Sequence, residues 1–300
     1  MRIPSYAYSD SIVRQLHKLN GAQVQTQVQL ATGQKIQNAE EDPRAMGRAL
    51  NTITEKSQIQ TQNANLVRSQ TVAEFSMAAY EQLKVLSKEA SQLANNSDGL
   101  TSSADYRARN LQVNQLIEQS LRILNTKLGG DHIFGGANTA ETPYLAERDA
   151  NGNIINVTYQ GSTDPAEDVQ IRIGEGARIA PFSKGSANAE IGEWVNNLIA
   201  FRDALGNEDL PSANALVSDL ENADMTILIN LVEFGAIQQS MDVTSQINRA
   251  RFNELERLIS SELDIDTAET IVRLNQLQTS YQSALQSTGR IMEMSLLDYI

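Results

Sequence analysis

The sequence contains no cysteine among its 300 residues, which excludes disulfides, thiolate metal sites and cysteine nucleophiles. Aromatic residues make up only 5% of the chain, and hydrophobic residues make up 41%. Large rings usually fill the centre of a compact globular enzyme of this size. Their shortage favours thin helical bundles with cores of Leu, Ile, Val and Ala over a fold with a large pocket.

Long apolar runs are also missing. No segment approaches the roughly 18 apolar residues that a membrane helix needs, and the nearest, MTILINLVEFGAI, is interrupted by Asn230 and Glu233. The first residues, MRIPSYAYSDSIVRQLHKLNG, lack the apolar core of a cleaved secretory signal. We therefore expect a soluble chain without membrane insertion, which uses a different route if it is exported.

Positive charge is scarce, because 24 Lys and Arg residues face 37 Asp and Glu residues, giving a net charge of −13. An acidic chain repels phosphate backbones, so we expect no nucleic-acid partner. The two histidines, His17 and His132, cannot form a two-histidine metal motif at helical spacing, and no Ser-His-Asp arrangement is suggested. We expect no enzyme activity, no catalytic residues, no cofactor and no metal site.

Two short motifs resemble ligand sites only weakly. The stretch from Asp149, DANGN, begins like a calcium loop, but Ile154 and Gln160 stand where such a loop needs glycine and glutamate. The stretch GEGARI from Gly174 lacks the third glycine of a nucleotide-binding loop. We interpret the first as a hairpin turn and the second as a loop. An enzyme with a dispersed site in this region remains an alternative.

The first helix is predicted over residues 10–31 by apolar residues at alternating steps of four and three. This heptad stripe has polar members in its middle, and its apolar members are Ile12, Leu16, Leu19 and Leu30.

A joint, LATGQKIQNAEEDP, follows. Gly33 is predicted to end the helix, Asp42 to cap the next one and Pro43 to occupy its first position, with Ile36 as a lone apolar residue between them.

The helical pattern then runs from Pro43 to about Asn96, and a third helix from about Ala104 to Lys127 is expected to pair with it antiparallel. Alternating segments with a turn at Asn151-Gly152 predict a β-rich insert. From Pro211 another stripe alternates steps of four and three: Leu216, Leu220, Ala223, Ile227, Asn230, Phe234, Ile237, Met241, Thr244, Asn248, Arg251, Leu255, Leu258. We interpret its polar members as setting the register of packing between copies.

The last helix follows Asp266, which is predicted to cap it. Its apolar residues are Ile271, Leu274, Tyr281, Leu285, Met292, Leu296 and Leu297. We expect the two terminal helices to pair with each other and with copies of themselves. The fold class is mainly α: a long antiparallel helical bundle or coiled coil built from the N- and C-terminal regions, with a small β-rich central insert.

The expected organisation has six parts. Residues 1–32 form an N-terminal inner coiled-coil helix and 33–42 the joint. Residues 43–136 form a long helical hairpin, 137–190 the β-rich surface insert, 191–262 the returning helices of the core bundle, and 263–300 a C-terminal inner coiled-coil helix.

Four segments resemble the flagellin family, and within it the branch that joins hook to filament. They are MRI at the start, LATGQKIQNAEEDPRAM, HIFGGANTAETPY after the third helix, and SLLDYI at the end. The second is similar to the family's Leu-x-Ser/Thr-Gly-x-(Lys/Arg)-Ile-x-x-Ala-x-Asp-Asp-Pro pattern, with Glu41 where aspartate is frequent. Together with the helix order, the resemblance covers both terminal thirds.

The resemblance implies a structural subunit of the bacterial flagellum that is exported unfolded by flagellar type III secretion and assembles outside the cell through its terminal helices. Implied partners are copies of itself, neighbouring flagellar proteins (another hook-associated protein or flagellin), the export apparatus and an export chaperone. Besides an enzyme, two alternatives remain open. One is a flagellin that forms the filament itself, and the other is a soluble coiled-coil adaptor.

Overall fold

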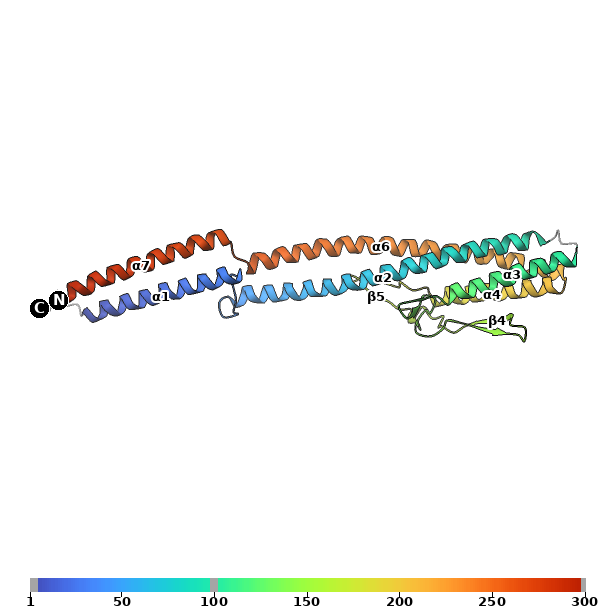
Figure 1. Ribbon diagram of the computed structural model, residues 1–300, viewed down its shortest axis with the longest axis horizontal. Coiled ribbons are helices and arrows are strands. Elements are labelled where there is room, and N and C mark those ends of the chain that lie inside the picture. The colour runs from blue at the N-terminus through green and yellow to red at the C-terminus, as the bar shows by residue number, and fades with distance from the viewer. Residues whose placement is uncertain (1–4, 98–101, 298–300) are drawn as a thin grey trace. The chain divides into compact units, whose positions relative to one another are not determined.

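Figure 1 shows the protein as a computed structural model, which describes residues 5–97 and 102–297, with side chains over residues 10–97 and 102–290. The helices are α1 (Ser5–Thr32), α2 (Pro43–Asn95), α3 (Ser103–Leu124), α4 (Gly185–Gly206), α5 (Leu210–Ala215), α6 (Val217–Leu263) and α7 (Thr267–Leu297). The chain divides into two units: residues 1–58 with 251–300, and residues 59–250. The predicted class, mainly α with a small β-rich insert, is confirmed.

Unit 1, residues 1–58 and 251–300, is built from α1, α7, the two short linkers beside them and the adjoining ends of α2 and α6. Helices α1 and α7 lie side by side (Figure 1). They run antiparallel, because the linker after α1 lies beside the linker before α7.

Unit 2, residues 59–250, contains the remainder of α2 and α6 together with α3, α4 and α5. Its core includes large, fully buried side chains: Tyr80, Phe134, Tyr144, Trp194 and Phe201. Helix α6 turns its predicted stripe toward this core, with Leu220, Ile227, Phe234 and Met241 buried at steps of seven residues. These steps keep one side of the helix against the rest of the unit.

The insert consists of three two-stranded antiparallel sheets. They pair β1 (Lys127–Leu128) with β2 (Asp131–His132), β3 (Tyr144–Arg148) with β4 (Ile154–Tyr159), and β5 (Ile171–Arg172) with β6 (Arg178–Ile179). A 3₁₀ turn, η2, covers Pro165–Glu167. The turn predicted at Asn151-Gly152 joins β3 to β4, where Asp149 accepts the amides of Asn151 and Asn153 at 2.9 and 2.8 Å.

The segment HIFGG anchors the insert in the core of unit 2. Phe134 is fully buried and its ring centroid lies 5.3 Å from that of Tyr80. The Asn188 side-chain amide of α4 donates to the Phe134 carbonyl at 2.8 Å, and the Asn188 backbone carbonyl accepts the Tyr144 hydroxyl at 2.7 Å. Gly136 has a φ of +58° and a Cβ there would lie 2.6 Å from the Tyr159 hydroxyl, so only glycine fits.

The polar members of the α6 stripe differ from the expectation that they meet other copies. Asn248 is buried, and its amide donates to Asn63 at 3.1 Å and to the Ile173 carbonyl at 2.8 Å. Asn230 donates to the Thr226 carbonyl of its own helix at 2.8 Å. These side chains therefore find their partners within the chain, because α2 and the β5–β6 hairpin lie against this side of α6.

Candidate assembly surface

The terminal helices meet along a narrow seam in unit 1. On α1 the predicted residues Ile12, Leu16, Leu19 and Leu30 are half-buried, and Thr26 between them is buried. On α7 the seam follows steps of four and three: Thr270, Leu274, Leu277, Tyr281, Ala284 and Thr288 are buried or half-buried. Half-burial means that one helix covers only part of each apolar side chain.

Ile271 and Leu285 do not share this seam, in contrast to Leu274 and Tyr281. Their exposed fractions are 46% and 45%. Each follows a seam residue by one position and is therefore turned about 100° around the helix. Met292, Leu296 and Leu297 lie outside the residues whose side chains the structure describes.

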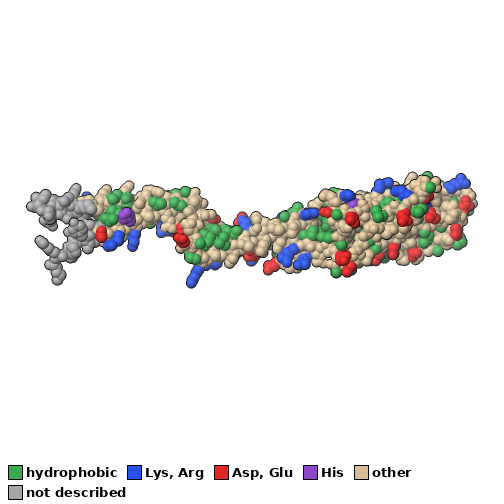
Figure 2. Space-filling model, turned by 90° about the horizontal axis from the view of Figure 1, so that it is seen from below, with side chains coloured by type: hydrophobic (Ala, Val, Ile, Leu, Met, Phe, Trp, Pro, Cys, Tyr) green, Lys and Arg blue, Asp and Glu red, His purple; other side chains and the backbone are tan. Residues whose placement is uncertain are grey.

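The terminal helices expose further apolar side chains away from the seam. They are Val13, Val24 and Val28 on α1 and Val272 on α7, in addition to Ile271 and Leu285. Figure 2 shows hydrophobic side chains gathered in patches on the face it presents. An isolated pair of helices with apolar residues on both its inner and outer sides buries only part of them, so it is suited to packing against further helices.

The joint is ordered by backbone geometry and by one buried side chain. Gly33 has a φ of +74°, the left-handed conformation that ends a helix, and its amide donates to the Gln29 carbonyl at 2.8 Å. Ile36 is only 6% exposed. Ile36, the lone apolar residue in the middle of the joint, therefore fixes the joint by being buried.

A second linker, which the sequence did not reveal as a partner, holds the joint in place. Gln34 and Asp264 form an antiparallel bridge. The Lys35 amide donates to the Leu263 carbonyl at 2.6 Å, and the Ile265 amide donates to the Gly33 carbonyl at 3.1 Å. The chain is thereby clamped where it enters and leaves the terminal helices.

Carboxylates cap the helices on the far side of both linkers. Asp42 accepts the amides of Arg44 and Ala45 at 3.0 and 2.9 Å, and Pro43 takes the first helical position of α2. The bond from the Ala45 amide is the main reason that the pKa of Asp42 lies below its usual value. Asp266 likewise accepts the amides of Ala268 and Glu269 at 2.9 and 3.1 Å at the start of α7.

Ion pairs join α2 to α6 within unit 1. Arg48 donates to both carboxylate oxygens of Glu262 at 2.8 Å, which raises its pKa and lowers that of Glu262. Lys56 contacts Glu256 at 2.8 Å. A third pair, between Arg251 and Glu55, is 2.7 Å long. Exposed pairs of this kind contribute little individually, but bidentate geometry favours one register.

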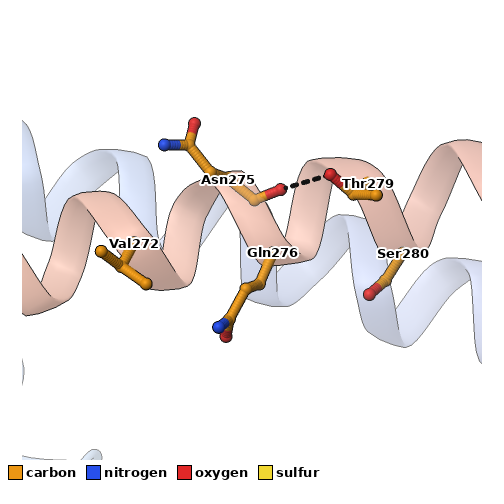
Figure 3. A pocket seen from close by; sticks show the side chains of 5 residues that line it. All are labelled: Val272, Asn275, Gln276, Thr279 and Ser280. Carbon is orange, nitrogen blue, oxygen red and sulfur yellow. Dashed lines mark hydrogen bonds between the residues drawn. The ribbon is translucent and has the colours of Figure 1, made fainter.

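Two pockets on the described surface can be compared for side chains that could take part in catalysis or metal binding. One of about 410 Å³ lies on α7 and is lined by Val272, Asn275, Gln276, Thr279 and Ser280 (Figure 3). The Thr279 hydroxyl already donates to the Asn275 carbonyl at 2.9 Å. These side chains include no titratable group that could act as an acid, base or nucleophile.

A second hollow, of about 360 Å³, lies between α2 and α6 in unit 2 and includes Asp242 and Arg249. Among the described residues, no group of three or more His, Asp or Glu side chains is placed to bind a metal ion. Over the same part of the chain, no helix combines the length and the apolarity needed to cross a membrane. His17 is exposed on α1, whereas His132 is buried, which lowers its pKa.

These features define a class of protein: a mainly α-helical chain whose terminal helices pair beyond a clamped joint and keep apolar residues exposed. No protein-family model and no curated protein sequence matches the chain. Solved structures do match its fold, at low sequence identity.

A flagellar hook-associated protein of Vibrio parahaemolyticus superimposes with a TM-score of 0.63 at 13% identity, over 75% of this chain and 100% of its own. FlgL of Xanthomonas campestris gives 0.59 at 13% identity, over 68% and 98%. FlgL of Bacillus cereus gives 0.52 at 18% identity, over 65% and 98%. The chain therefore has the fold of flagellar hook-associated proteins, as its motifs predicted.

Proposed function

We propose that this chain is a structural subunit of the bacterial flagellum, a hook-associated protein 3 that connects the hook to the filament. The observation that carries the proposal is the α1–α7 pair, whose seam residues are half-covered while Ile271 and Leu285 stay exposed. The fold shared with flagellar hook-associated proteins supports it.

The terminal helices are the assembly surface in this proposal. Copies of the chain pack their α1–α7 pairs around one another, and neighbouring flagellar proteins continue the same packing above and below. Burial of the exposed apolar residues drives the association, because a two-helix pair leaves much of its apolar surface in water. The chain acts as a connector and not as an enzyme.

The proposal places the assembled protein outside the cell, after export by flagellar type III secretion with an export chaperone. A chain without cysteine passes through an export channel with no disulfide to reduce.

Immunogold electron microscopy of intact cells tests the proposed function, with an antibody against the β3–β4 hairpin, residues 144–159. Gold confined to the base of the filament is the expected result. Gold along the whole filament would mean that the chain is a flagellin. Flagella without gold in every growth phase would reject both, and favour a soluble coiled-coil adaptor.

A further inference from the structure

Helix α6 is apolar on two opposite sides within unit 2. One side faces the core. The other side carries an outer stripe, which we define as Met225, Ile229, Val232, Ala236, Ser240, Val243 and Ile247. Its five large apolar side chains are among the most exposed large hydrophobic residues that the structure describes, at 60%, 60%, 67%, 51% and 62% in sequence order. Steps of three, four and seven residues keep these five and Ala236 on one side of the helix.

The length and spacing of the outer stripe suit packing against another α-helix. It runs over 23 residues, or about 33 Å of helix, and none of its members is charged. Monomeric proteins rarely leave a contiguous apolar patch of more than a few hundred Å² in water. Apolar residues at alternating steps of four and three match the side chains of another α-helix.

The stripe is close to symmetric about Ala236. Met225 and Ile247 lie eleven residues before and after it, and Ile229 and Val243 lie seven before and after. A second copy of α6 running in the opposite direction therefore brings Met225 against Ile247 and Ile229 against Val243, while Val232 meets Ser240. The small side chains of Ala236 and Ser240 allow the two helices to approach closely.

Charge selects the antiparallel direction. About the same centre, Glu233 falls opposite Gln239, whereas Asp242 contacts α2, where the Gln70 amide donates to its carboxylate at 3.3 Å. In a parallel, in-register pair, Glu233, which is ion-paired with Lys184, would instead lie level with its own copy, in a chain that already carries a net charge of −13. Like charges at one level destabilise a helix pair.

We propose that the outer stripe of α6 binds the outer stripe of a second copy of this chain, antiparallel about Ala236. This inference does not rest on the proposed function. A pair related by a two-fold axis is closed and cannot by itself extend into a helical assembly whose copies all point one way. The antiparallel pair is therefore a form of the unassembled chain.

Sedimentation equilibrium of the full chain over a range of concentrations tests the pairing. Val232→Glu places a charge in the stripe and is expected to weaken self-association at least about tenfold. Val85→Glu on α2 is the matched control, because Val85 is 66% exposed and Val232 is 67% exposed. Trp194 fluorescence checks that unit 2 stays folded in both. A wild-type chain that remains monomeric, or an equal effect of the two variants, would overturn the proposal.

Disulfide trapping tests the direction, and the natural chain has no cysteine to interfere. Met225→Cys and Ile247→Cys variants, one of them tagged, are expected to form a mixed disulfide-linked dimer when combined under oxidising conditions. Each variant alone is expected to stay largely unlinked. Efficient linking of each variant to itself, without the mixed product, would indicate a parallel pair and reject the proposal.

Discussion

At the residue scale, two glycines of unit 1 are expected to respond in opposite directions to an added methyl group. Gly33→Ala forces alanine to a φ of +74°, which costs about 1–2 kcal/mol. Gly47→Ala lies inside α2 with nothing within 4 Å of the new Cβ, and is expected to stabilise by about 0.5–1 kcal/mol.

The measurement is hydrogen exchange at the Lys35 and Ile265 amides, which bond across the two linkers. Protection is expected to fall at least about fivefold in Gly33→Ala. Gly47→Ala is expected to leave it unchanged or to raise it. Unchanged protection in Gly33→Ala would show that the backbone conformation at the joint is not what holds the linkers together.

The acidic groups of unit 1 make its stability depend on pH. Backbone hydrogen bonds to Asp42 and the ion pair from Arg48 to Glu262 lower the pKa of both carboxyls in the folded state. The unfolded chain therefore binds more protons than the folded chain as the pH falls through the ordinary values of 3.8 and 4.5. The stabilisation is complete above these values and is lost as acid protonates the folded groups.

Thermal unfolding followed by far-UV circular dichroism checks this pH dependence. Trp194, the only tryptophan, lies in unit 2, so a dichroism change without a fluorescence change reports unit 1. The midpoint of that transition is expected to drop on acidification below about pH 4.5. Asp42→Asn with Glu262→Gln removes both titrations, and should flatten the dependence while Asn still caps α2. An equally steep decline in the double variant would assign it to other groups.

At the element scale, local sequence predicted the helices and the joint well because their signals are local. Gly33, Asp42 and Pro43 act through their own backbone and the next turn of helix, so their effects can be derived from neighbours in sequence. The bridge between Gln34 and Asp264 joins residues far apart in sequence, and neither has a side-chain signature for it. No local pattern could have predicted it.

The terminal seam does not include every apolar residue predicted for the last helix. The sequence predicted Ile271 and Leu285 together with Leu274 and Tyr281 because all four side chains are apolar. The strip of a helix that contacts one partner helix is narrower than its whole apolar face. The seam is completed instead by Thr270, Ala284 and Thr288, which are small or polar. We therefore interpret the exposed apolar residues beside the α1–α7 seam as candidate contacts with a further partner.

Asn188 is one of the α4 residues that hold the insert, together with Asn196 and Arg202, which bond to the β4 backbone. Asn188 is fully buried, its side-chain amide donates to the Phe134 carbonyl, and its side-chain oxygen accepts the Ser183 hydroxyl. Asn188→Ala leaves buried groups without partners and is expected to destabilise unit 2 by about 1–3 kcal/mol. Urea unfolding followed by Trp194 fluorescence measures the loss.

The matched control is Asn222→Ala, because Asn222 is exposed on α6 in the same unit. It is expected to change the midpoint by no more than about 0.5 kcal/mol. Similar midpoints for the two variants would mean that the hydrogen bonds of Asn188 are replaced by water at little cost.

At the scale of the whole molecule, the two units have separate tasks in the proposed function. Unit 1 carries the terminal helices that meet other copies, and unit 2 has its own core around Trp194 and Phe201. A substitution on the outside of α7 is therefore expected to affect assembly without affecting the fold of unit 2.

Leu285→Asp makes that separation testable. Leu285 is 45% exposed and lies beside the α1–α7 seam, so the aspartate stays in water in the free chain but is desolvated when another copy covers it. Burial of an unpaired carboxylate is expected to cost several kcal/mol per contact and to abolish incorporation into flagella.

Gln286→Asp, which adds the same charge one residue later at another exposed position, is the control. Immunogold labelling of sheared flagella measures incorporation, and Trp194 fluorescence of the purified variant measures folding. If Leu285→Asp chains were incorporated as well as Gln286→Asp chains, the exposed side of α7 would not be an assembly contact.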